Sequence, residues 1–176
     1  MSRLTVGSIE GLTENSNVIS VPTGHTLNAV DGLQIGGVAQ GVLTSYTPTW
    51  GNLTLGNATQ DFAYCVVGNL MFIQGRVVWG STTSMSTNPS FSIPSGYQSA
   101  VPAYNAVGHL NMRDTGTAEY FGQVKGNGVG STTCLLKTST TNSTYGQGSA
   151  INGSIPFTWT TNDEILLTVT ISVTAV

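Results

Sequence analysis

The C-terminal part of the chain alternates apolar and polar residues with a period of two. From residue 164 to residue 173 every second position holds a large aliphatic side chain, namely Ile165, Leu167, Val169, Ile171 and Val173. Successive side chains of a β-strand point to opposite faces, whereas a helix needs apolar residues every three or four positions. The pattern therefore predicts a strand with one buried face and one face that is mostly hydroxyl-bearing.

The chain from about residue 46 onward repeats a short run of β-forming residues followed by Gly, Ser, Asn or Pro. Residues 61–79 predict a hairpin, because Gly68 and Asn69 tolerate the positive φ of a tight turn. Gly75 interrupts the second arm of this hairpin and predicts a β-bulge. Further strands are expected at residues 52–55, 90–93, 101–112, 118–125, 132–138 and 154–157, with loops at 80–89 and 140–148.

These strands predict an all-β fold. Helix signals are nearly absent, so the crossover helices that a parallel sheet requires are missing and the strands should pair antiparallel. Their number and spacing fit two packed sheets. We therefore expect residues 46–176 to form an antiparallel β-sandwich of the jelly-roll type.

Residues 1–45 differ in kind from the rest and predict an extended N-terminal arm. Their apolar residues come in twos and threes between turn residues, and a segment this short cannot bury enough surface to offset its own ordering entropy. The arm must therefore contact its own sandwich, sister subunits or a different protein. The residues that we expect to make this contact are Leu4, Val6, Ile9, Leu12, Val18, Ile19, Val21, Leu27, Leu33 and Ile35.

The chain carries little charge. Only 7% of its residues are charged and its formal net charge is −3, so the basic patch that holds a nucleic-acid backbone is missing. With 26 Thr, 18 Ser and 13 Asn, the surface must be hydroxyl and amide. No charged residue occurs at 77–112 or at 138–162, which is poor protection against edge pairing for a free monomer. This pattern favours an assembly component over a soluble catalyst.

The apolar runs and the two cysteines bear on the location of the chain. No run of about 18 apolar residues occurs and no secretory signal is recognisable, so we expect no membrane insertion and a product that accumulates soluble where it is made. Cys65 and Cys134 each lie within an apolar or alternating stretch. We expect two reduced, buried thiols, with a disulfide between neighbouring strands as the alternative.

The sequence offers no recognisable catalytic, metal or cofactor site. His25 and His109 lack partners at metal-ligand spacing. Asp163 and Glu164 would point to opposite faces of a strand, so they cannot form a facing acid and base pair, and we expect a solvated junction there. The glycines at 126–130 fit a hairpin loop, because no helix follows to complete a phosphate-binding loop. We expect a protein that is not an enzyme and needs no cofactor.

Aromatic residues at or beside loops are the one class that could form a recognition surface. Such rings stack on sugars or pack at interfaces, although single aromatics at strand ends also serve as lids on a core. The candidates for recognition are Trp50, Tyr97, Tyr104 and Tyr145, and Trp79 and Trp159 lie in similar positions.

Two parts of the chain resemble virion proteins of tailed bacteriophages, notably those of cyanophages. The first comprises Leu4-Thr-Val-Gly-Ser-Ile-Glu-Gly-Leu12, Val18-Ile-Ser-Val-Pro-Thr-Gly-His-Thr-Leu-Asn28 and Leu33-Gln-Ile-Gly-Gly37, and it resembles their N-terminal stretch. The second comprises Tyr46-Thr-Pro-Thr-Trp50, Gly80-Ser-Thr-Thr-Ser84, Phe91-Ser-Ile-Pro94 and Ile155-Pro-Phe-Thr-Trp159. It is similar to the compact β-sandwich at the ends of phage fibres and on phage heads.

The resemblance implies a homotrimeric virion component, made in the host cytoplasm and assembled on the particle exterior. In one role it is a capsid decoration (cement) protein that binds the major capsid protein. In the other it is a tail or head fibre module that recognises host surface polysaccharide. We favour the first role, because the chain passes from arm to sandwich within about ten residues and leaves no room for a fibre shaft.

Overall fold

The computed structural model describes residues 34–35, 38–39, 41–142 and 145–176, with side chains at 41–139 and 148–176. Every regular element in this part of the chain is a β-strand. No helix that could span a membrane is found among these residues. The arm residues from Leu4 to Leu33 lie outside the described residues, and Ile35 is described only as part of the backbone of a strand.

Two strands form a small separate ribbon and eleven form one sheet, and all pairs of neighbours run antiparallel. The main sheet has the order β3-β5-β6-β13-β9-β10-β11-β7-β4, with β12 added to β11 and β8 added to β13. The strands are β1 (Gln34–Ile35), β2 (Val38–Ala39), β3 (Thr44–Ser45), β4 (Trp50–Thr54), β5 (Thr59–Val67), β6 (Leu70–Val78), β7 (Ser84–Ser92), β8 (Tyr97–Ser99), β9 (Ala106–Asp114), β10 (Ala118–Gly126), β11 (Thr133–Asn142), β12 (Tyr145–Ala150) and β13 (Glu164–Ala175).

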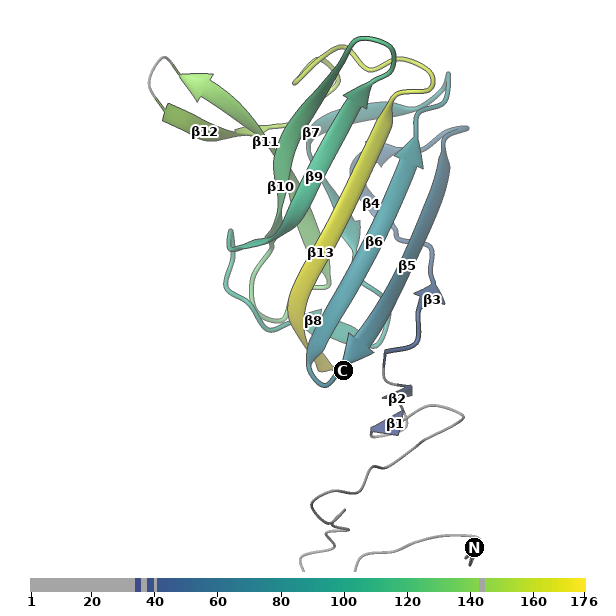
Figure 1. Cartoon of the computed structure of the whole chain (residues 1–176), viewed down its shortest axis with the longest axis vertical. Helices are drawn as coiled ribbons and strands as arrows, with labels where there is room; N and C mark the ends of the chain where they lie inside the picture. The colour runs from purple at the N-terminus through teal and green to yellow at the C-terminus, as the bar shows by residue number, and fades with distance from the viewer. Residues whose placement is uncertain (1–33, 36–37, 40, 143–144) are drawn as a thin grey trace, which may run out of the picture. The chain divides into compact units, whose positions relative to one another are not determined.

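The main sheet curls into a half-barrel (Figure 1). In Figure 1, β5, β6, β13, β9 and β10 lie in front, and β7 and β4 lie behind them. Hydrogen bonding continues around the bend, because Cys134 of β11 is paired with Gly126 of β10 on one side and with Phe91 of β7 on the other. The all-β antiparallel prediction is confirmed, and the eleven strands from β3 to β13 belong to one continuous sheet.

The two edges of the curled sheet meet through the segment between β3 and β4. The Ser92 N–H donates to the Thr49 carbonyl at 2.9 Å, and the Thr49 N–H donates to the Ser92 hydroxyl oxygen at 3.0 Å. On the next residue, Trp50 Nε1 donates to Gln60 Oε1 of β5 at 2.9 Å. The ring of Trp50 also packs against Phe62 and Phe91 at centroid distances of 5.9 and 5.7 Å. This aromatic cluster holds β4 over β5.

The alternation in the last strand is confirmed. The five aliphatic residues of β13 that the period of two selects are all buried inside the half-barrel. They pack with inward-facing residues of the neighbouring strands, such as Met71, Ile73, Leu110 and Met112. β13 pairs with β6 over nine residues and with β9 over six, so it is the central strand of the front layer.

The hairpin at residues 61–79 is confirmed as β5 and β6, joined at Gly68 and Asn69. The predicted bulge at Gly75 is wrong, because the pairing between the two strands has no break. Gly75 instead makes room for the ring of Phe62 on the facing strand. A Cβ at position 75 would overlap Phe62 Cε1, so a larger residue does not fit there unless the ring moves.

Several other strand boundaries were predicted wrongly. Most of the expected loop at 80–89 belongs to β7, and much of the expected loop at 140–148 belongs to β11 and β12. The expected strand at 101–112 begins at Ala106, whereas the hairpin loop between β10 and β11 is confirmed. Residues 154–157 are not a strand and contribute only an isolated bridge between Asn152 and Ile155.

The segment from 151 to 163 covers one open end of the half-barrel. Its Trp159 ring stacks on Trp79 at 4.7 Å, and Phe157 lies 4.4 Å from Trp159 and 5.2 Å from Tyr120. Trp159 Nε1 donates to the Asn152 carbonyl at 3.1 Å, so the buried indole is satisfied. Trp79 and Trp159 are therefore lids on the core.

Candidate functional site

The charged residues of the described part gather at one end of the half-barrel, which we call the charged end. β5 spans nine residues, so the two ends lie roughly 27 Å apart along it. Lys125 lies at the opposite end, where its Nζ donates to the Tyr104 carbonyl at 3.4 Å, and Lys137 lies in the middle of β11. The residues of the charged end are Asp61, Arg76, Arg113, Asp114, Glu119, Asp163 and Glu164.

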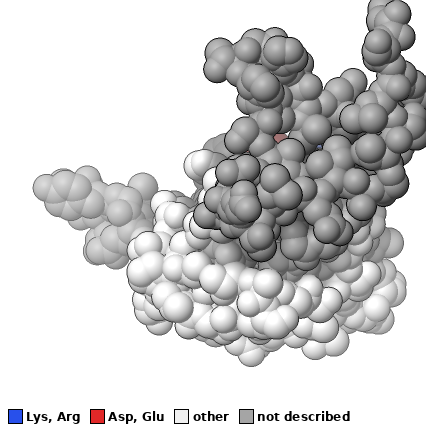
Figure 2. Space-filling model, turned by 90° about the horizontal axis from the view of Figure 1, so that it is seen from below, with Lys and Arg blue, Asp and Glu red and all other residues white. Residues whose placement is uncertain are grey.

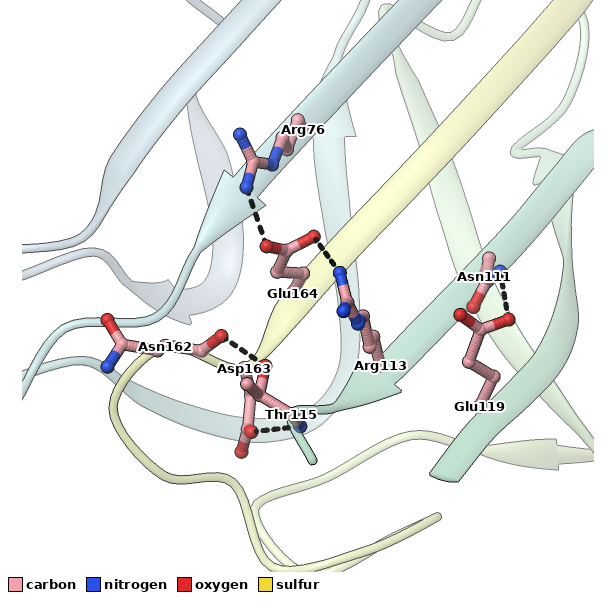
Figure 3. A network of polar contacts seen from close by, with 8 residues as sticks. All are labelled: Arg76, Asn111, Arg113, Thr115, Glu119, Asn162, Asp163 and Glu164. Atoms are coloured by element: carbon pink, nitrogen blue, oxygen red, sulfur yellow. Dashed lines mark hydrogen bonds and ion pairs between the residues drawn. The ribbon is translucent and has the colours of Figure 1, made fainter. Parts of the chain in front are cut away.

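Glu164 lies at the centre of the charged end, between two arginines (Figure 3). Its carboxylate accepts a hydrogen bond from Arg76 at 2.6 Å and lies 3.8 Å from Arg113. The hydrogen bond to Glu164 raises the pKa of Arg76 above its ordinary value. The side chain of Glu164 is only 10% exposed. The expectation that this junction is solvated is therefore wrong.

Asp163 is also buried, and its carboxylate ties two turns together (Figure 3). One oxygen accepts from the backbone N–H of Thr115 at 3.0 Å, and the other accepts from the N–H and the hydroxyl of Thr160. The Thr115 hydroxyl returns a hydrogen bond to the Asn162 carbonyl at 2.6 Å. Asp163 and Glu164 thus engage different partners, and the pair acts as a structural clasp.

The opposite end of the half-barrel, which we call the apolar end, exposes large apolar side chains. Figure 2 views this end, and the described atoms visible on it are almost all uncharged. Leu43, for example, is 59% exposed and Val67 is 51% exposed. The exposed apolar residues of this end are Val42, Leu43, Val67, Leu70, Tyr104, Val129 and Val176.

Backbone contacts place these seven residues at the same end, and Tyr104 is placed there by its hydrogen bond to Gly126, the last residue of β10. Gly41, next to Val42, donates to the Val66 carbonyl, and Val173 donates to Asn69 in the turn that joins β5 and β6. Val176 donates to Gly96, and Gly130, next to Val129, donates to Ser99 of β8, which is paired with β13. The chain enters the half-barrel here, at residues 41–46 along β5.

A second feature is a hollow of about 590 Å³ on the outer face of β5, β6, β13, β9 and β10. The register of these strands aligns Asp61, Arg76, Leu166, Asn111 and Phe121 in one row across the hollow. The next row holds smaller or uncharged polar residues, among them Gln74, Thr168 and His109. Phe121 forms one wall and is 66% exposed.

Of the three predicted recognition aromatics whose side chains are described, two pack against the core. Trp50 is half-buried against the core, and Tyr97 in β8 is half-buried with its ring 6.4 Å from that of Tyr64. Burial raises the pKa of Tyr97. Tyr104 is 66% exposed at the apolar end, whereas the side chain of Tyr145 lies outside the described residues. Sequence reasoning did not single out Phe121, although it lies on the same face of β10 as the polar residues Glu119 and Gln123.

Both cysteines are free thiols, so the disulfide alternative is wrong. Cys134 is fully buried, as expected, whereas Cys65 is half-buried on the outer face of β5. Burial in the apolar core raises the pKa of the Cys134 thiol to about 12. The two thiols should therefore differ sharply in reactivity, because the thiolate is the reactive form.

We expect a thiol reagent such as Ellman's reagent to modify Cys65 in the native protein at pH 8 and to leave Cys134 unmodified. Cys134 should react only after unfolding, because it is both inaccessible and protonated at this pH. The measurement is the time course of thiol release with and without denaturant. The variant Cys65→Ser should lose the native phase, and equal rates for both thiols would contradict the assignment.

Metal-ligand clusters are not found among the described residues, where no three His, Cys, Asp or Glu side chains come together. His109 lies exposed on the rim of the hollow, and His25 lies outside the described residues. Comparisons of the chain with known protein families, with curated proteins and with solved structures each found no match.

Proposed function

We propose that this chain is a non-enzymatic structural protein of a phage-type virion, a homotrimeric decoration (cement) protein that binds the major capsid protein. In this proposal the arm attaches to the particle. The half-barrel of each subunit takes the place of the expected jelly-roll-like sandwich and projects outward. The proposal rests on the resemblance of both parts of the chain to phage virion proteins and on the polarity of the described surface.

The observation that carries the proposal is the separation of charged and apolar residues between the two ends. The chain enters the half-barrel at the end where seven large apolar side chains are exposed. Soluble monomers seldom expose such groups together without a partner. The charged end, in contrast, exposes both arginines, Asp61 and Glu119 to water, which solvates such groups well. An attached apolar end and a solvated charged end fit a protein that stands on a surface.

The mechanism would be thermodynamic. A protein that binds the assembled shell, and not its separate subunits, stabilises the shell by mass action. Three linked arms would bind together more tightly than one, because each further contact is intramolecular. Exposed apolar side chains beside the entry point would extend the contact beyond the arm. No chemical step is required.

The test is binding of the full chain to capsids that lack it, made from the major capsid protein encoded in the same genome. Three arm residues, Leu4, Val6 and Ile9, are changed together to serine, and a matched control changes the polar neighbours Thr5 and Ser8 to alanine. We expect the first variant to lose most of its occupancy in a sedimentation assay. The control should bind as the unchanged chain does.

The apolar end is tested separately with a pair of substitutions of matched exposure. Leu70 at the apolar end and Ile155 in the segment that covers the other end are each 39% exposed. We expect Leu70→Asp to weaken capsid binding or trimer formation and Ile155→Asp to leave both unchanged. Full capsid occupancy by the arm variant, or a monomer in sedimentation equilibrium for the unchanged chain, would contradict the proposal.

A second candidate role, a tail or head fibre module that recognises host surface polysaccharide, is favoured by the outer-face hollow. Its exposed phenylalanine and polar rim are groups that protein sites use for sugars. Saturable binding of the purified chain to host cells, together with failure to bind capsids, would favour this role.

A further inference from the structure

We propose that the hollow on the outer face of β5, β6, β13, β9 and β10 is a binding site for a single neutral sugar unit of a glycan. The biological use of this site rests on the second proposed role, a fibre module that recognises host polysaccharide. The binding of the sugar by the hollow does not depend on that role. It is measured on the isolated chain, so its failure leaves the capsid assay and the first proposed role unaffected.

The size and walls of the hollow suit a sugar ring. A volume of about 590 Å³ lies within the ordinary range for small-ligand sites, roughly 300–1,000 Å³. Leu166 lies half-buried in the middle of the floor, and Phe121 stands exposed two strands away on the wall. One face of a pyranose is lined with C–H groups, and such a face packs on an aromatic ring. Phe121 supplies that ring.

The rim of the hollow offers hydrogen-bonding groups that the described part of the protein leaves unused. Asp61, Gln74, His109 and Thr168 line the hollow, and within the described residues their side chains have no hydrogen-bond partner. Together they provide a carboxylate acceptor, an amide with both functions, an imidazole and a hydroxyl. Hydroxyl groups of a sugar both donate and accept, so they match this mixed set.

Asn111 adds an independent observation. Its Nδ2 donates to Glu119 Oε2 at 3.3 Å (Figure 3), whereas its Oδ1 is buried without a partner in the described part of the chain. A buried acceptor without a donor is costly. Asn111 lies in the row between Leu166 and Phe121, at the wall of the hollow. A ligand hydroxyl is the kind of donor that this oxygen lacks.

The charges of the hollow indicate a neutral ligand that is bound and not cleaved. Asp61 and Arg76 are the charged residues of the lining, and their formal charges cancel. Arg76 already donates to Glu164 and lies opposite Asp61, so its positive charge is compensated within the protein. Hydrolysis of a glycoside requires two carboxylates across the bond, and the lining provides only Asp61.

The test is a titration of the full chain with methyl glycosides of glucose, galactose and mannose and with N-acetylglucosamine, followed by saturation-transfer NMR. We expect saturable binding of at least one of these sugars. Phe121→Ala and Asp61→Asn should each weaken it by about tenfold. Phe72 serves as the matched control, because it is exposed on the same face, 41%, but does not line the hollow. Phe72→Ala should bind as the unchanged chain does.

Three outcomes would overturn the inference. The first is no saturable binding of any of the four sugars. The second is binding that survives both Phe121→Ala and Asp61→Asn, or that Phe72→Ala weakens equally. The third is a change of oligomeric state in sedimentation velocity caused by Phe121→Ala, which would make this face a contact between subunits. Tighter binding of glucuronic acid than of glucose would contradict the neutral ligand.

Discussion

Replacement of Phe91 by alanine is expected to lower the free energy of unfolding by about 3–5 kcal/mol. Phe91 is fully buried, and its ring lies 5.7 Å from that of Trp50 and 6.0 Å from that of Phe62. These three rings join β7, β4 and β5, which meet where the curled sheet closes on itself. Loss of the central ring leaves a cavity that the surrounding strands cannot fill without opening the curl.

The measurement is equilibrium unfolding in urea, with the slope compared between variants to check that the folded state is equally compact. Phe121→Ala is the control, because that ring is 66% exposed and its removal should change stability by no more than about 0.5 kcal/mol. Equal losses for the two variants would show that the Phe91 cluster does not hold the closure together.

Replacement of Asp163 by alanine is expected to cost about 3 kcal/mol of stability. The backbone N–H groups of Thr115 and Thr160, and the Thr160 hydroxyl, all donate to this carboxylate. Without it, three donors of part-buried hydrogen bonds lose their acceptor, and the turn after β9 is no longer tied to the start of β13. Because Trp159 directly precedes Thr160, the stacking of Trp159 on Trp79 should loosen as well.

The measurement is again urea unfolding, together with tryptophan fluorescence as a probe of the lid. Asp114→Ala is the matched control, because Asp114 is a half-buried carboxylate at the same end whose side chain bonds to no other described residue. We expect it to change stability by less than about 1 kcal/mol. A fluorescence change as large for Asp114→Ala as for Asp163→Ala would contradict the clasp.

The parts of the fold that could be predicted are those with a strong local pattern. The alternation in β13 and the Gly68-Asn69 turn depend on residues that are adjacent in sequence, and both were confirmed. The role of Gly75 could not be predicted, because the ring that it accommodates belongs to a different strand. The first part of β7 was predicted as a loop because its residues are mainly Ser, Thr and Asn, and its partners β4 and β11 are distant in sequence.

The candidate site was less predictable than the fold. Sequence reasoning expected aromatic residues at loops, whereas Trp50 and Tyr97 pack on the core. The hollow is made by five strands whose outward residues become neighbours only through the register of the sheet. The burial of Asp163 and Glu164 was missed for the same reason, since their partners are supplied by β6 and the turn after β9.

The separation of charged and apolar residues also makes the half-barrel an electric dipole. The charged end holds five carboxylates and two arginines, whereas the two lysines of the described part lie away from it. At low ionic strength a negatively charged surface would repel the carboxylate-rich end and turn the molecule. A half-barrel without its arm would then meet such a surface with the opposite end, where Lys125 lies, so orientation would precede contact.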